Sequence, residues 1–232
     1  MIPIKDTIRS RSFPLVNWLL IITNVLVFLF EISLGQNQLD QFISIYGLVP
    51  AHLNLANPLS FFPFFSYMFL HGGWLHIISN MWVLFIFGDN VEDRLGSLRY
   101  LIFYLLGGLA AAVLQVVIDV HSTVPSIGAS GAIAAVMGAY FTFYPKAKVV
   151  TLVPIWIIPW FIDIPAVIFL GLWFLLQLFS GFLALSSAQS ASMGGVAWWA
   201  HVGGFVFGLL ICRLFEQRKL YRQYYPDEYY PW

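Results

Sequence analysis

The chain has 232 residues, of which 60% are hydrophobic and only 9% are Asp, Glu, Lys or Arg. Soluble domains carry about 25% charged residues, so this composition excludes an ordinary soluble fold and favours a protein that crosses a membrane several times. The 11 basic residues equal the 11 acidic ones in number, which excludes a general electrostatic attraction to nucleic acid.

Six apolar stretches have the composition of membrane helices, which need about 20 mainly apolar residues. The first follows a basic segment and has no small-residue cleavage site, so we expect a retained span and not a signal peptide. The fourth is only about 22 Å long at 1.5 Å per residue, so its start should lie below one membrane surface. The six stretches are residues 15–34, 74–91, 98–118, 129–144, 164–185 and 197–215.

Two apolar segments fit no simple span because prolines interrupt them, residues 35–70 and residues 149–163. We expect both to be interfacial or partly inserted loops, packed on protein where their backbone polar groups are satisfied. The prediction is therefore an all-α membrane protein with six transmembrane helices and a partly inserted first outer loop.

Basic residues divide the predicted loops into two classes, and the positive-inside rule assigns the basic class to the cytoplasm. All 11 basic residues lie in the segments outside spans one and six or in the loops after spans two and four, or, like Arg99 and Arg213, at the adjoining span ends, while the other three loops hold none. We therefore expect a membrane domain over residues 15–215 between two cytoplasmic segments, residues 1–14 and 216–232. The expected location is the cell (inner) membrane.

Four of the polar side chains inside predicted spans carry the argument, because such groups are costly there and face the bundle interior. His76 and Asn80 are four residues apart in span two and share one helix face; Ser130 opens span four and His201 comes early in span six. These spans all run inward from the outer side, so the four residues should lie at comparable depth. Ser130 and His201 each head a stripe of small residues, which lets two helices approach closely.

A serine hydroxyl becomes a useful nucleophile when a base within about 3 Å removes its proton. Ser130 and His201 are the candidate nucleophile and base, while the Ser130 N–H, His76 and Asn80 are candidate donors to the oxyanion. Spacing ties no carboxylate to His201, so a Ser–His dyad is the simpler interpretation. No metal or cofactor site is predicted. Taken singly, a glycine-flanked serine also fits helix packing, and a membrane histidine also fits a structural or proton-carrying role.

The segments FLHGGWLHIISNMWVLFIFGDNVEDRLG, FYLLGG, VPSIGASGAIAAVMGAYF and AHVGGFVFG resemble the successive signatures of rhomboid intramembrane serine proteases, in the family's order. The resemblance covers about residues 15–215. It implies a six-helix rhomboid core with Ser130 as nucleophile, His201 as base, and His76, Asn80 and the Ser130 N–H as oxyanion donors. It also implies single-span membrane proteins as substrates, cut near the outer surface at a small residue.

One departure concerns the first outer loop, where many rhomboids carry a Trp-Arg pair and this chain reads SFFPFFSYMFLHGG. The resemblance therefore does not carry over to how that loop anchors the protein in lipid. Span five, which contains the bulky residues Trp173, Phe174 and Phe179, is a candidate lateral gate. The small, polar loop 186–197 is a candidate lid.

Two functions from other classes remain open from the sequence. A small proton-coupled transporter would use His76 and His201 as relays, but would also need polar residues in the inner half of the membrane or inverted repeats. A non-catalytic scaffold that binds membrane helices would not require the serine and the histidine together.

Overall fold

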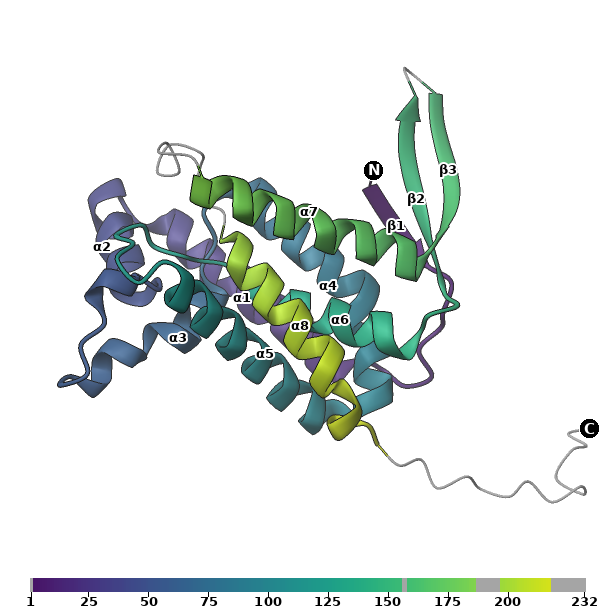
Figure 1. Cartoon of the computed structure of the whole chain (residues 1–232), viewed down its shortest axis with the longest axis horizontal. Helices are drawn as coiled ribbons and strands as arrows, with labels where there is room; N and C mark the ends of the chain where they lie inside the picture. Colours follow the sequence, from purple (N-terminus) through teal and green to yellow (C-terminus); the bar gives the residue numbers. More distant parts are fainter. Residues whose placement is uncertain (1, 156–157, 187–196, 218–232) are drawn as a thin grey trace, which may run out of the picture.

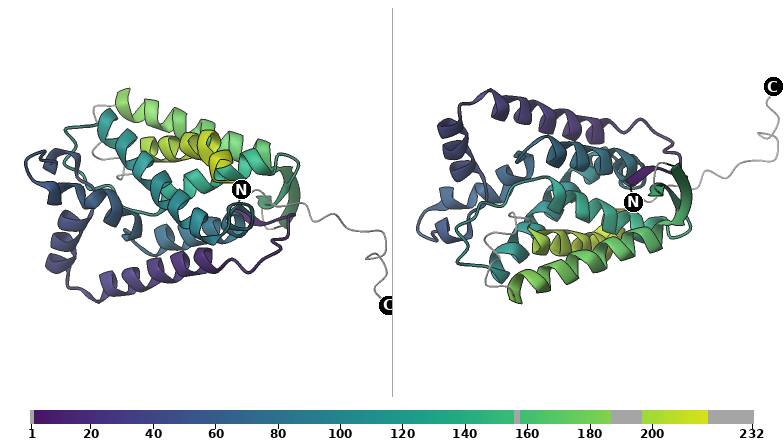
Figure 2. Two further views of the ribbon diagram at one scale, coloured as in Figure 1. Left: turned by 90° about the horizontal axis from the view of Figure 1, so that it is seen from below. Right: turned by 90° about the horizontal axis from the view of Figure 1, so that it is seen from above.

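The computed structural model describes residues 2–155, 158–186 and 197–217. Long helices form one bundle, with short helices of the first loop at one end and a small β-sheet at the other (Figure 1). In both views of Figure 2, α1 (Leu15–Ser33) and α7 (Ala166–Ser186) form the two opposite edges of this bundle. The α7 helix therefore lies at the periphery and has one side open to lipid.

The long helices coincide with the apolar stretches identified in the sequence, and each begins within two residues of its predicted start. The largest difference is at α4, which continues four residues beyond the predicted end at residue 91. Besides α1 and α7 they are α4 (Trp74–Leu95), α5 (Ser97–Ile118), α6 (Ser130–Phe143) and α8 (Trp198–Phe215).

Four of these helices, α1, α5, α7 and α8, are long and apolar enough on their own to cross a membrane. The α4 helix qualifies only together with the preceding helical segment Pro58–Phe69, from which it bends by 79°. The α6 helix has 14 residues and is shorter than a full span. The prediction of a helical integral membrane protein is confirmed, whereas among the described residues length and composition support four or five spans and do not establish six.

The short α6 helix forms the centre of the bundle, and every residue from Gly131 to Tyr140 is buried. Its small residues face those of α8. A Cβ atom on Gly204 would overlap the carbonyl oxygen of Gly131, and one on Gly208 would overlap that of Ala135. The two backbones therefore touch, as the small-residue stripes predict, and this contact fixes the relative height of the two helix starts.

The predicted first loop is largely helical and supports the segment that leads into α6. The backbone groups of Leu48 and Ser126 exchange two hydrogen bonds of 3.0 and 2.8 Å, and the N–H of Gly128 donates to the carbonyl of Tyr67 at 2.9 Å. Proline begins three of the loop's short helices, where its fixed φ suits the first turn. These elements are α2 (Gln36–Tyr46), η1 (Pro50–His52), η2 (Pro58–Phe61), α3 (Pro63–Ser66) and η3 (Tyr67–Phe69).

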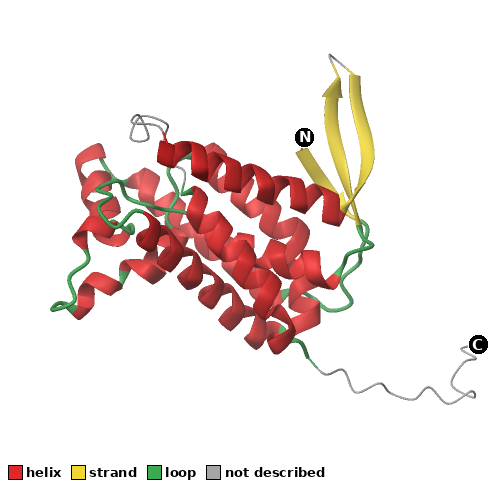
Figure 3. Cartoon of the chain, in the orientation of Figure 1, coloured by secondary structure: helices red, strands yellow, loops and turns green. Residues whose placement is uncertain are grey.

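Residues 149–163 do not form the irregular loop that we expected; most of this segment is an antiparallel strand pair (Figure 3). The strands are β2 (Lys148–Ile155) and β3 (Ile158–Pro165). A third strand from near the amino terminus, β1 (Ile2–Asp6), pairs with β2, so the sheet order is β1-β2-β3. The β-branched residues of β2 suit a pleated strand. The two prolines that interrupt this apolar segment, Pro154 and Pro159, face each other near the hairpin tip, where they interrupt little of the ladder.

The β1 strand is also attached to the helical bundle through Asp6. Its carboxylate accepts hydrogen bonds from the Tyr140 hydroxyl of α6 and, at 2.9 Å, from the Asn90 amide of α4. Burial raises the pKa of Asp6 to about 6, although the hydrogen bond from Tyr140 opposes this shift. The first residues of the chain are thus part of the folded domain and hold α4 and α6 together at the end away from Ser130.

Candidate functional site

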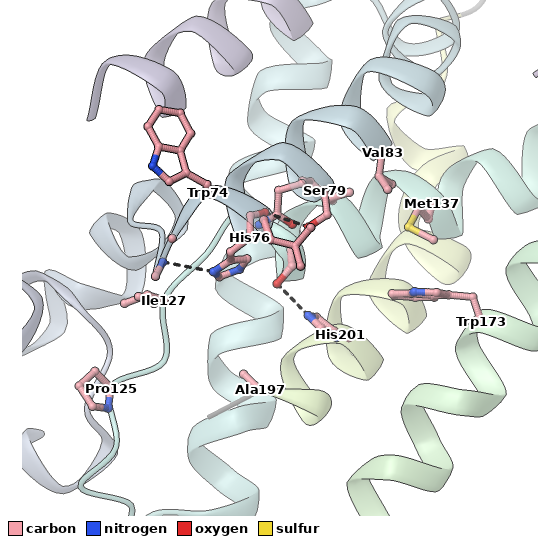
Figure 4. Close-up of a pocket in the computed structure, with 16 residues that line it drawn as sticks. Trp74, His76, Ser79, Val83, Pro125, Ile127, Met137, Trp173, Ala197 and His201 are labelled. Carbon is pink, nitrogen blue, oxygen red and sulfur yellow. Dashed lines mark hydrogen bonds between the residues drawn. The ribbon is translucent and has the colours of Figure 1, made fainter. Parts of the chain in front are cut away.

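The structure brings Ser130 and His201 together although they are 71 positions apart in the chain. The Nε2 atom of His201 lies 2.7 Å from the Oγ atom of Ser130, within hydrogen-bond distance (Figure 4). Ser130 is the first residue of α6, and His201 lies in the first turn of α8. The glycine contacts between the two helices set this pairing, because they hold the two helix starts at one level.

The second nitrogen of His201 has a partner that the sequence analysis missed. The Nδ1 atom lies 2.8 Å from the Oε1 atom of Gln177, which projects from α7. The available signal was an amide side chain within an apolar span, which is costly unless it is hydrogen-bonded. Gln177 lies between Leu176 and Leu178 in an apolar run.

His76 and Asn80, both predicted to be oxyanion donors, lie on the first two turns of α4 and face the segment before Ser130. The backbone N–H of Gly72 donates to Nδ1 of His76 at 3.3 Å, so the neutral ring carries its proton on Nε2. A Cβ atom on Gly128 would lie 2.7 Å from His76 Nε2 and 3.7 Å from Asn80 Nδ2. Both side-chain donors therefore converge on the backbone two residues before Ser130.

The Asn80 amide nitrogen is buried and has no hydrogen-bond partner among the residues that the structure describes. A buried donor without an acceptor costs about 1–3 kcal/mol. Such a cost is reasonable at a site where the acceptor arrives with a ligand. The backbone N–H groups at the start of α6 have no partner within their own helix.

A cavity of about 890 Å³ contains these groups (Figure 4). Its volume falls within the range of about 300–1,000 Å³ that is typical of ligand sites. The walls are mainly apolar, and the polar groups are concentrated around Ser130 and His201. The apolar lining includes Trp74, Val83, Ile133, Met137 and Trp173.

Two tryptophans enclose the His201 ring. The Trp173 ring of α7 lies 5.8 Å from it between centroids, at 38°, and the Trp198 ring lies 6.2 Å away at 89°. These contacts restrict rotation of the imidazole, so the direction of its two nitrogens depends on α7 as well as on α8.

His71 lies just before α4 and is buried. Its backbone N–H donates to the Glu31 carboxylate at 3.1 Å, and its ring lies 5.1 Å from that of His76, edge to face. It therefore supports the turn that presents His76. The predicted lid lies outside the described residues except at its two ends, residues 186 and 197.

Together these groups supply what acyl transfer requires. A hydroxyl is paired with an imidazole, the imidazole has a second partner, and two side-chain donors converge on the backbone two residues before Ser130. Such a constellation is recognised by geometry and by the role of each group, independently of sequence order.

Comparison with known proteins adds a family match. A family model described as the Rhomboid domain matches residues 58–218. The chain is 38% identical to RHOMBOID-like protein 6, mitochondrial, of Arabidopsis thaliana over 72 residues. This aligned stretch covers 31% of this chain and 23% of that protein. It is 28% identical over 164 residues to the presenilin-associated rhomboid-like protein, mitochondrial, of Bos taurus, which covers 67% of this chain and 38% of that protein.

A third relative has protease in its name. The chain is 30% identical over 151 residues to Rhomboid-like protease 5 of Toxoplasma gondii, which covers 62% of this chain and 15% of that protein. In each of these three cases the chain spans less than half of the relative's length. The similarity therefore describes a shared membrane domain.

Proposed function

The chain belongs to the rhomboid family, and we propose that it is an intramembrane serine endopeptidase that cuts single-span membrane proteins. The observation that carries this proposal is the 2.7 Å approach of His201 Nε2 to Ser130 Oγ inside a cavity that also contains two side-chain donors. Neither helix packing nor proton transport requires a serine, a histidine and two converging donors in one cavity.

In the proposed reaction His201 Nε2 takes the proton of Ser130 as Oγ bonds to the carbonyl carbon of the scissile peptide. The carbonyl oxygen becomes an oxyanion, which the side chains of His76 and Asn80 and the N–H of Ser130 stabilise. When the C–N bond breaks, the imidazolium returns its proton to the leaving amine. Water then hydrolyses the acyl-enzyme by the same steps in reverse, with His201 again as the base.

The membrane arrangement is part of this proposal. Six spans, with α6 as a short central one, place both termini and the basic loops in the cytoplasm and the cavity toward the outer side. The first loop presents Leu55, Leu59 and Phe62 as exposed apolar residues, which supports its partial insertion into lipid. No basic residue is needed there, so the absence of a Trp-Arg pair is compatible with this placement.

A cleavage assay tests the function. Purified protein is reconstituted in liposomes with a labelled single-span substrate that has a small residue near its outer end. We expect wild-type protein and Ser79→Ala to cleave it and Ser130→Ala to be inactive. Ser79 is a matched control because it lines the same cavity, while its hydroxyl donates a hydrogen bond of 2.9 Å to the main-chain carbonyl of His76.

The alternatives are separated by the same experiment. Cleavage that persists in Ser130→Ala would remove the protease assignment. If both proteins bind the substrate equally and cleave nothing, the chain acts as a scaffold for membrane helices. Proton uptake that depends on His76 and His201, without cleavage, would indicate a transporter.

A further inference from the structure

Gln177 occupies a position that its chemistry alone does not favour. It lies in the middle of the apolar α7 helix, yet its side chain points inward and the residue is only 7% exposed. Its neighbours Leu175 and Leu176 are 59% and 61% exposed on the opposite side. An inward-facing amide in a membrane helix is stabilised only where it finds hydrogen-bond partners.

The orientation of the amide follows from its two partners. The Nε2 group of Gln177 lies 3.4 Å from the main-chain carbonyl of Trp173 and donates to it, and Oε1 faces His201. A carbonyl oxygen can only accept, so reversing the amide would set two oxygen atoms against each other. The Oε1 atom is therefore the one presented to the imidazole.

The tautomer of His201 follows in turn. Because Oε1 only accepts, Nδ1 of the neutral ring must carry the proton, and the lone pair on Nε2 faces Ser130. This is the tautomer that can remove a proton from the serine hydroxyl. The opposite tautomer would place an N–H against the serine and leave Nδ1 opposed to the Oε1 lone pairs.

We propose that Gln177 is a positioning residue for the dyad, which fixes His201 in its base-competent tautomer and supports the imidazolium that forms in the transition state. The inference rests on the proposed function. The site then depends on three helices, because Gln177 of α7 contacts His201 of α8, which contacts Ser130 of α6. Because Gln177 is not among the residues that line the cavity, its effect should appear in kcat and not in KM.

The first test compares substitutions of similar size at this position. Gln177→Met removes the oxygen that accepts from His201, whereas Gln177→Glu keeps an acceptor oxygen, now of a carboxyl group, at the same distance from the main chain. Loss of a hydrogen bond to a group that becomes charged should lower kcat about 10- to 100-fold in the Met variant. We expect KM to stay unchanged and the Glu variant to recover most of the activity. The control Leu176→Met alters the lipid-facing side of the same helix and should match wild type.

Two further measurements do not depend on a membrane substrate. The rate at which a small fluorophosphonate labels Ser130 should fall in parallel with kcat. In protein labelled with ¹⁵N-histidine, the signal assigned to His201 by its loss in His201→Ala should report a proton on Nδ1 in wild type. It should report a mixture of tautomers in Gln177→Met and not in Leu176→Met.

The outcomes are distinct. An unchanged tautomer and labelling rate in Gln177→Met would overturn the assignment. The assignment would also be overturned if Gln177→Glu lost as much activity as Gln177→Met while the His201 tautomer stayed unchanged, because that pattern indicates a packing role. If wild-type protein neither cleaves nor is labelled, the proposed function fails, and the ¹⁵N measurement still decides whether Gln177 sets the tautomer.

Discussion

The backbone at Gly128 lies so close to the imidazole of His76 that a Cβ atom there would be 2.7 Å from Nε2. The same glycine has φ +124°, a conformation that side chains rarely allow. Two independent requirements therefore favour glycine at this position. One is the close approach to a proposed oxyanion donor, and the other is the turn that brings the chain into α6.

Comparing Gly128→Ala with Gly73→Ala should separate the effect of the close approach from that of the backbone conformation. In Gly128→Ala we expect activity to fall at least about 100-fold, because displacing His76 by a fraction of an ångström misplaces a donor. Gly73→Ala is the control, since Gly73 also has a positive φ of 152° but a Cβ there would meet nothing within 4 Å. Cleavage rates and melting temperatures in detergent are measured for both. Equal losses of activity would show that strain alone is responsible.

Asn80→Ala should reduce kcat about 100- to 1,000-fold, the effect of removing one oxyanion donor from a preorganised site. Because the amide nitrogen has no partner among the described residues, its removal should not lower the melting temperature. Fluorophosphonate labelling and peptide-bond cleavage are followed together. A lower melting temperature with normal kcat would instead make Asn80 a structural residue.

The α7 helix should act as the entry gate for membrane substrates. Only 22% of its most apolar window is buried inside the protein, against 33% in α1, α5 and α8. Cysteines placed at Val83 of α4 and Trp173 of α7, which line the same cavity, are joined by a thiol-reactive crosslinker. We expect the crosslink to block cleavage of a single-span substrate but to leave fluorophosphonate labelling intact, with the uncrosslinked double variant as reference. Undiminished cleavage would exclude the gate.

Asp6 should make stability depend on pH. Its pKa lies at about 6, above the ordinary value of 3.8, so the folded protein binds a proton more tightly than the unfolded chain does. The stability that this tighter proton binding contributes is fully present below about pH 4 and is lost as the pH rises through about 6. The melting temperature of wild type relative to Asp6→Asn, measured in detergent, should therefore fall between pH 4 and pH 7. A difference that stays constant over this range would contradict the assignment.

The sequence by itself determined the helices and the residues of the proposed dyad. Hydropathy is a local property, so it located the starts of all six long helices within two residues. The cost of polar groups in an apolar span then made Ser130, His201, His76 and Asn80 conspicuous. The small-residue stripes predicted which helices touch, because only glycine, which has no Cβ, lets the backbones meet at Gly204 and Gly208.

Tertiary structure alone decided the strands and the contacts between distant segments. The prolines of residues 149–163 argued against a membrane span, and only the pairing of Pro154 with Pro159 near a hairpin tip shows how a strand ladder accommodates them. The attachment of Asp6 to Tyr140 joins residues 134 positions apart. No periodicity encodes such a contact.

The same limit applies at the site. Gln177 was visible as a polar residue in span five, but nothing in its spacing connected it with His201, 24 positions further on. The direction of an imidazole and of an amide depends on which donors and acceptors surround them in space. Composition and spacing therefore identified the proposed nucleophile and base, while the packing of α7 against α8 determined which nitrogen of the base carries the proton.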